Sequence, residues 1–104
     1  MGSALLGCGL NDIKHRRNIL SSLQATNAPL SVVETTLGVR FTIERLGSAA
    51  NSVPLKTTAT NWNERLAQKR SRAFAAGHTS TISMQTWIFL DQRDRLIDFE
   101  VGAQ

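Results

Sequence analysis

Apolar residues recur at helical spacing near the start of the chain. Over 12–25 they recur at near-helical spacing, at Ile13, Ile19, Leu20 and Leu23, which predicts an amphipathic helix. Pro29 follows shortly after, and a proline disfavours helical backbone at the residue before it. We therefore expect this first helix to end before Pro29.

A second and shorter helix is predicted over 32–37. Ser31 and Glu34 have the spacing of a capping box, in which each side chain satisfies a backbone N–H at the start of a helix. Gly38 comes next, and a glycine just past a helix takes the left-handed conformation that ends it.

Alternation of apolar and polar residues replaces helical spacing later in the chain. It predicts a half-buried strand over 39–46. It also predicts one strand over 79–90, whose apolar end on both faces suits a central position in a sheet. A polar turn at 91–94 joins this strand to a last one at 95–101, so the two form a β-hairpin. The last strand places Ile97, Phe99 and Val101 opposite Leu96, Asp98 and Glu100.

The region between the first two predicted strands is polar and then basic. Residues 47–60 are rich in Ser, Ala, Asn and Thr, which indicates a loop. Residues 61–76 contain strong helix formers and no β-branched residue, which predicts a helix ended by Gly77. The alternative is an irregular basic excursion between strands.

Helices that precede strands indicate the α+β class: two N-terminal helices packed on a small antiparallel sheet of three to four strands that ends in a β-hairpin. The 104 residues suit one domain. We expect 1–10 to be a disordered leader remnant or tether and 11–104 to be the domain. Within it, 47–78 is a candidate for a mobile insertion.

Charge is unevenly distributed along the chain. Twelve basic and eight acidic residues give a net charge of +4 and a pI of about 10.2. Part of the basic excess lies in 61–76, where the candidate binding residues are Trp62, Arg65, Lys69, Arg70 and Arg72. Cations beside an indole suit phosphates and bases. The same surface could instead contact anionic lipid headgroups or an acidic protein, or be an ordinary solvated helix face.

The sequence contains no clear catalytic constellation. His15 and His78 lack a Cys, Asp or Glu at ligand spacing, and a single cysteine excludes an internal disulfide or a cysteine-based zinc site. Asp98 and Glu100 share a strand face, as a carboxylate pair or as ordinary solvated side chains. We therefore expect no catalytic residue, no metal and no cofactor.

Two aromatic residues of the 79–90 strand are further binding candidates. Trp87 and Phe89 fall on the same face of that strand. They are either part of the core or an exposed aromatic strip that binds a partner.

The N-terminus contains the residues Leu5-Leu6-Gly7-Cys8, which have the form of a bacterial lipobox. In such a motif the cysteine thiol carries the lipid, which makes Cys8 the candidate lipidation site. A functional signal also needs a charged and an apolar region before the cysteine. Either a leader has been trimmed, or this is a disordered tail with an incidental thiol.

Three motifs together resemble one family. They are Leu5-Leu6-Gly7-Cys8, the pattern Ser-x-x-Glu-x-x-Leu-Gly over 31–38, and the terminal hairpin from Trp87 to Val101. The set is similar to the small bacterial envelope lipoproteins of the SmpA/OmlA (BamE-like) type. That family has the fold of the β-lactamase inhibitor proteins, with two helices against an antiparallel sheet. The resemblance implies protein binding and supplies no catalytic residue. This chain departs from the family in having Asp94 at the usual turn glycine and in the basic segment 61–76.

These features predict a non-catalytic cell-envelope lipoprotein domain that acts as a protein–protein interaction or assembly module. We expect a protein partner in the envelope and a lipid anchor at Cys8 that holds the domain on the periplasmic face of the membrane. The alternative is a small basic cytoplasmic protein that binds nucleic acid, which we consider the weaker hypothesis because four cations on a helix are commonly a solvated face.

Overall fold

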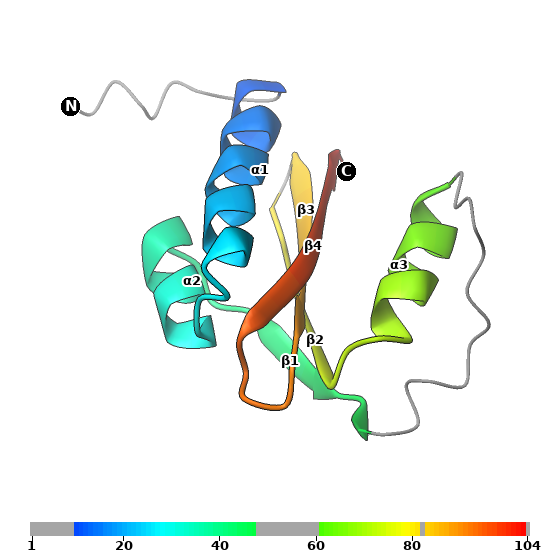
Figure 1. The fold of residues 1–104 in the computed structure, drawn as a ribbon. Coiled ribbons are helices and arrows are strands. Elements are labelled where there is room, and N and C mark those ends of the chain that lie inside the picture. Colours follow the sequence, from blue (N-terminus) through cyan, green and yellow to red (C-terminus); the bar gives the residue numbers. More distant parts are fainter. Residues whose placement is uncertain (1–9, 48–60, 82, 104) are drawn as a thin grey trace.

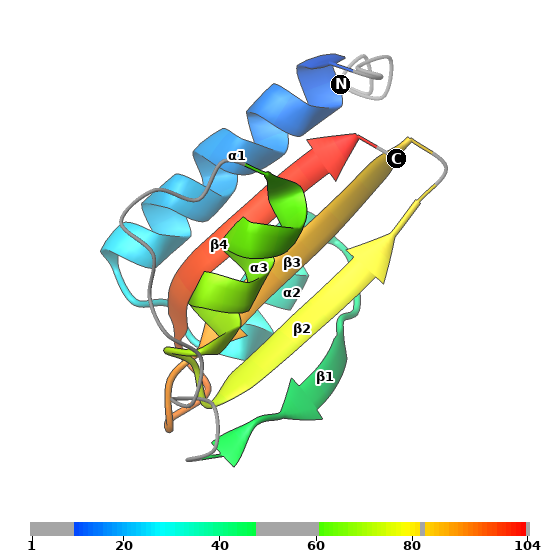
Figure 2. The same cartoon turned by 90° about the vertical axis from the view of Figure 1, so that its right-hand side faces the viewer.

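Two layers of helix enclose one antiparallel sheet in the computed structural model, which describes residues 10–47, 61–81 and 83–103 (Figure 1). The elements are α1 (Leu10–Ala25), α2 (Leu30–Leu37), β1 (Thr42–Arg45), α3 (Trp62–Arg70), β2 (Ala75–Ser80), β3 (Met84–Leu90) and β4 (Leu96–Ala103). The strands lie side by side in chain order. Helices α1 and α2 cover one face, and α3 lies on the other (Figures 1 and 2). The predicted α+β class, with two N-terminal helices packed on a sheet that ends in a hairpin, is confirmed.

The larger core lies between the sheet and the pair α1 and α2. Leu20 of α1 and Val33 of α2 are fully buried there, together with Ile88 and Leu90 of β3. One buried polar side chain also lies on this strand: Thr86, whose hydroxyl accepts a hydrogen bond from Arg16 at 2.9 Å. Of the apolar positions that predicted the first helix, α1 buries Ile13 and Leu20 in this core, and Leu23 packs against it.

Helix α2 begins earlier than predicted and the capping box does not form. Pro29 occupies the N-cap, with no side-chain hydrogen bond there, and its carbonyl accepts from the N–H of Val33 at 3.1 Å. Glu34 instead accepts from the N–H of Phe41 at 2.9 Å, which ties α2 to the chain entering β1. The predicted role of Gly38 is confirmed, since its φ is 70° and its N–H bonds to the Glu34 carbonyl at 2.8 Å.

The single strand predicted over 79–90 is wrong, because two strands share that region and β2 begins at Ala75. Thr81 donates its N–H to the Met84 carbonyl at 2.8 Å and so closes the turn between β2 and β3. The small residues Ala75, Ala76 and Gly77 gave β2 no apolar–polar alternation in the sequence, and packing requires the glycine among them. A Cβ on Gly77 would lie 2.6 Å from Ile43 Cδ1.

The segment 61–76 is confirmed as helical only over its first part. Helix α3 ends at Arg70, and residues 71–74 lead directly into β2. The described part of the proposed insertion 47–78 therefore supplies α3 and part of the sheet. Residues 48–60 lie outside the described residues, as does the proposed tether up to residue 9.

A bulge near the start of β4 alters the predicted alternation. Phe89 pairs with Asp98 and Leu90 pairs with Leu96, so Ile97 is an extra residue. Leu96 consequently packs in the core beneath α1, and Ile97 packs in the smaller core beneath α3. In the turn before β4, Asp94 has a φ of 58°. It thus takes the left-handed conformation for which a glycine is usual.

Candidate functional site

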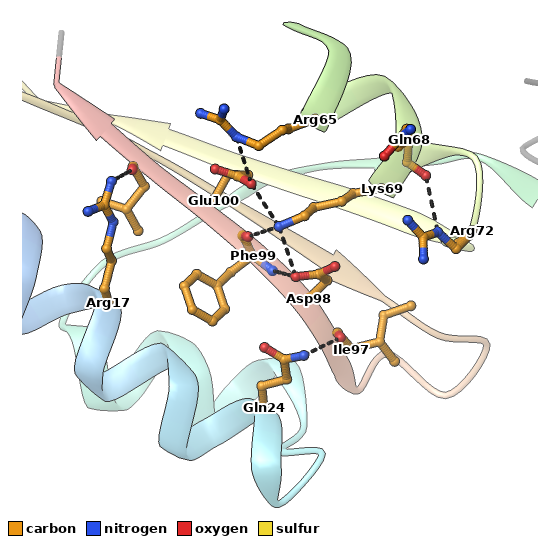
Figure 3. Close-up of polar contacts among 11 residues, drawn as sticks. Arg17, Gln24, Arg65, Gln68, Lys69, Arg72, Ile97, Asp98, Phe99 and Glu100 are labelled. Atoms are coloured by element: carbon orange, nitrogen blue, oxygen red, sulfur yellow. Dashed lines mark hydrogen bonds and ion pairs between the residues drawn. The ribbon is translucent and has the colours of Figure 1, made fainter. Parts of the chain in front are cut away.

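Helix α3 is held against β4 by a set of ion pairs (Figure 3). The ammonium of Lys69 lies 3.1 Å from an Asp98 oxygen and 2.8 Å from a Glu100 oxygen, and it donates to the Phe99 carbonyl at 2.8 Å. Arg65 Nε lies 3.3 Å from the same Glu100 oxygen. Two predicted binding cations therefore neutralise the two carboxylates that could have formed a catalytic pair.

Trp62, at the start of the same helix, also contacts β4. The Asn61 side chain accepts from the N–H of Glu64 at 2.8 Å and so fixes where α3 begins. The indole then lies over Gly102, where an added Cβ would come within 2.7 Å of Trp62 Cζ3. The Arg65 guanidinium carbon lies 6.0 Å from the ring centroid. Trp62 is thus a packing residue between helix and sheet.

The other two cations of the predicted patch lie near the end of α3. Arg70 bonds to both carboxylate oxygens of Glu44, at 2.9 and 3.2 Å, and this contact lowers the pKa of Glu44. Arg72 is exposed and donates from Nε to the Gln68 carbonyl at 3.5 Å. Among these four cations only Arg72 makes no ion pair with another described residue. The basic segment is therefore largely neutralised within the fold.

Side chains of α1 and α3 also bond to the free edge of β4. Three successive outward carbonyls accept from side chains: Ile97 from Gln24 at 2.9 Å, Phe99 from Lys69 at 2.8 Å and Val101 from Arg17 at 2.7 Å (Figure 3). Asp98 accepts the N–H of Phe99 at 2.8 Å. These groups would otherwise be available to pair with a strand of another chain, so this edge is blocked.

The opposite edge of the sheet is formed by β1, which has four residues. The N–H of Leu46 bonds to the Phe74 carbonyl at 2.8 Å. Successive residues of an antiparallel strand direct their backbone groups to opposite sides, so those of Ile43 and Arg45 point outward, away from β2. Such a short strand offers few bonds to an added strand. The edges of the sheet are therefore weak candidates for binding.

The two aromatic candidates of β3 separate in the structure. Phe89 is fully buried beneath α3, whereas Trp87 is half-buried. The Trp87 ring lies 4.8 Å from the ring of His78 and 6.5 Å from that of Phe89, and its N–H donates to Gln85 at 2.8 Å. Figure 2 shows α3 in front of β4 and β3, with β2 and β1 beside it. Trp87 therefore combines a fixed position with partial exposure.

Other kinds of site find no support in the described part of the chain. No cluster of three or more His, Cys, Asp or Glu side chains there is placed to hold a metal ion. None of its helices is both long enough and apolar enough to cross a membrane. The lipidation candidate Cys8 lies outside the described residues.

Comparison with known proteins adds no relative. No protein-family model, no curated protein and no solved structure matches the chain. The likeness to the envelope lipoproteins therefore rests on the sequence motifs alone.

Proposed function

We propose that this chain is a non-catalytic cell-envelope lipoprotein domain, anchored through Cys8, that acts as a protein–protein interaction or assembly module. The observation that carries the binding part of this proposal is the partly exposed indole of Trp87 on an inner strand. The lipobox Leu5-Leu6-Gly7-Cys8 and the motif resemblance support the envelope address.

The setting of Trp87 suits a binding residue. Contacts with Gln85, His78 and Phe89 fix its ring before any partner arrives. A preorganised aromatic side chain loses little conformational entropy on binding, and tryptophan is enriched among the residues that dominate protein interfaces. The sheet face around Trp87 and His78 is therefore our candidate partner surface.

The charge arrangement favours a protein partner over nucleic acid. Lys69 and Arg65 already contact Glu100, and Arg70 contacts Glu44. Phosphate binding depends on cations that can release counterions from the nucleic acid, and paired cations do this poorly.

The partner surface is tested by affinity capture from chemically cross-linked envelope fractions. A defined protein should copurify with the wild-type chain, and Trp87→Ala should lower its recovery about tenfold, as expected for an interface aromatic. The matched control is Val32→Ala, which truncates an apolar side chain on α2 that is 42% exposed. Equal recovery with both variants would exclude the Trp87 surface.

The anchor is tested separately by metabolic labelling with radioactive palmitate. The chain is expressed from its native gene with all of the upstream coding sequence. We expect label in the wild-type protein and none in Cys8→Ser. Label that persists in Cys8→Ser, or is absent from both, would refute the lipoprotein assignment.

A further inference from the structure

One end of the molecule is rich in exposed arginines. Helix α1 begins beside the end of β4 and finishes beside its start, because Arg17 bonds to Val101 and Gln24 bonds to Ile97. Leu10 therefore lies at one end of the sheet, and the β3–β4 turn at 91–95 lies at the other (Figure 1). The turn end holds four exposed arginines and two half-buried aspartates: Arg45, Arg72, Arg93, Arg95, Asp91 and Asp94.

A hollow of about 270 Å³ opens at this end. It is lined by Arg72, Phe74, Asp91, Gln92 and Arg93. The side of the hollow formed by Phe74 is unusual, because this aromatic residue is 37% exposed. Its backbone is nevertheless fixed on two sides: its N–H bonds to the Leu90 carbonyl at 2.9 Å, and its own carbonyl accepts from Leu46 at 2.8 Å. A rigid part of the fold thus presents an apolar ring to solvent.

The two arginines of the hollow are available for an anion. Neither Arg72 nor Arg93 forms an ion pair with another described residue. Asp91, the acid in the hollow, directs one carboxylate oxygen at the backbone N–H groups of Arg93 and Arg95, at 2.8 and 3.1 Å. Asp91 therefore bonds the backbone of the turn and forms no ion pair with Arg72 or Arg93.

We propose that this hollow binds an acidic peptide segment of a partner protein. Guanidinium groups bond carboxylates in a planar, charge-assisted arrangement, so acidic side chains would lie against Arg72 and Arg93. An apolar side chain next to those acids would pack on Phe74. Charge complementarity thus defines the occupant as acidic, and the exposed ring defines it as partly apolar.

Position in the molecule favours a protein segment over anionic lipid. The hollow lies at the end opposite Leu10, so a domain anchored ahead of Leu10 would direct the hollow away from the membrane. This step rests on the proposed function, since it assumes the anchor at Cys8. The binding chemistry itself does not depend on the anchor or on Trp87.

The test is an NMR titration of the isotope-labelled chain with an acetylated peptide of sequence Glu-Glu-Phe-Glu-Glu-Leu. We expect amide shifts confined to residues 71–74 and 91–95. Arg72→Gln combined with Arg93→Gln should weaken binding about tenfold, and Phe74→Ala should weaken it several-fold. A control that removes the same charge elsewhere, Lys14→Gln combined with Arg40→Gln, should bind as the wild type does.

Three outcomes would overturn the proposal. The first is the absence of shifts at these residues. The second is a result that indicates unspecific attraction: the neutral peptide Gln-Gln-Phe-Gln-Gln-Leu binds as tightly as the acidic one, or the control variant weakens binding as much as the double arginine variant does. The third is binding to phosphatidylcholine vesicles that contain phosphatidylglycerol, lost in the double arginine variant, without peptide binding; this would assign the hollow to lipid. None of these outcomes bears on capture through Trp87, so the two proposals fail independently.

Discussion

Replacing Lys69 with methionine should destabilise the contact between α3 and β4. The ammonium group makes three contacts, with Asp98, Glu100 and the Phe99 carbonyl, at 2.8 to 3.1 Å. Methionine retains most of the aliphatic length but donates nothing. The Phe99 carbonyl would lose its donor, Asp98 would keep only the N–H of Phe99, and Glu100 would keep only Arg65.

The size of the loss in the free energy of unfolding depends on how far these charged groups are shielded from water. Side-chain exposure is 20% for Lys69, 33% for Asp98 and 12% for Glu100. Breaking a fully buried ion pair costs about 3–5 kcal/mol, and an exposed pair contributes about 0–1 kcal/mol. We therefore expect Lys69→Met to lower the free energy of unfolding by about 2 kcal/mol. With a urea dependence of about 1–3 kcal/mol per molar, the unfolding midpoint should fall by about 1 M.

Urea unfolding followed by circular dichroism measures this loss. The control is Lys14→Met, which removes an exposed cation from α1 and should change stability by less than about 0.5 kcal/mol. Adding Asp98→Asn to Lys69→Met should recover part of the loss, because Asp98 pairs with no other cation among the described residues. If Lys69→Met and Lys14→Met unfold at the same urea concentration, the ion pairs do not hold α3 on the sheet.

Three further predictions concern other parts of the fold. Gly102→Ala should displace the Trp62 ring and cost about 1–3 kcal/mol in urea unfolding, whereas unchanged stability would contradict the tight contact. Glu44 should titrate below its ordinary pKa in carboxyl NMR because of Arg70, and Arg70→Gln should return its pKa to the ordinary range. Since the folded pKa of Glu44 is the lower one, its small contribution to stability is present above about pH 4.3 and is lost as pH falls through the folded value. Gly38→Ala should lower thermal stability by about 1 kcal/mol because its φ is 70°, and an unchanged melting temperature would argue against that conformation.

Sequence patterns were sufficient where one face of an element is buried. Leu20 and Leu23 repeat at helical spacing because α1 covers the sheet with a single stripe. Strand β2 gave no such signal, since Ala75, Ala76 and Gly77 are small and buried. The absence of a side chain at Gly77 is required by Ile43 and Ile88 of the adjacent strands, and that requirement exists only once the strands have paired.

For the candidate site, too, the sequence identifies the charged residues but not the contacts between them. The cations of 61–76 and the acids of the last strand are both visible in the sequence. Their mutual pairing was not predicted, because it depends on α3 packing across β4. Arg17 and Gln24 were missed as edge-closing residues for the same reason, since only the assembled fold places them beside β4. The bulge at Ile97 likewise reflects strand register.

The central claim is that the partner contacts the sheet surface around Trp87 and not the exposed surface of α3. Photo-cross-linking in the native envelope tests this claim most directly. A photoreactive residue at Ser80, which shares a strand face with His78, is compared with one at Asn63 on the exposed side of α3. We predict a protein adduct from position 80 that Trp87→Ala abolishes, and no adduct from position 63. A protein or nucleic-acid adduct from position 63 alone would contradict this account.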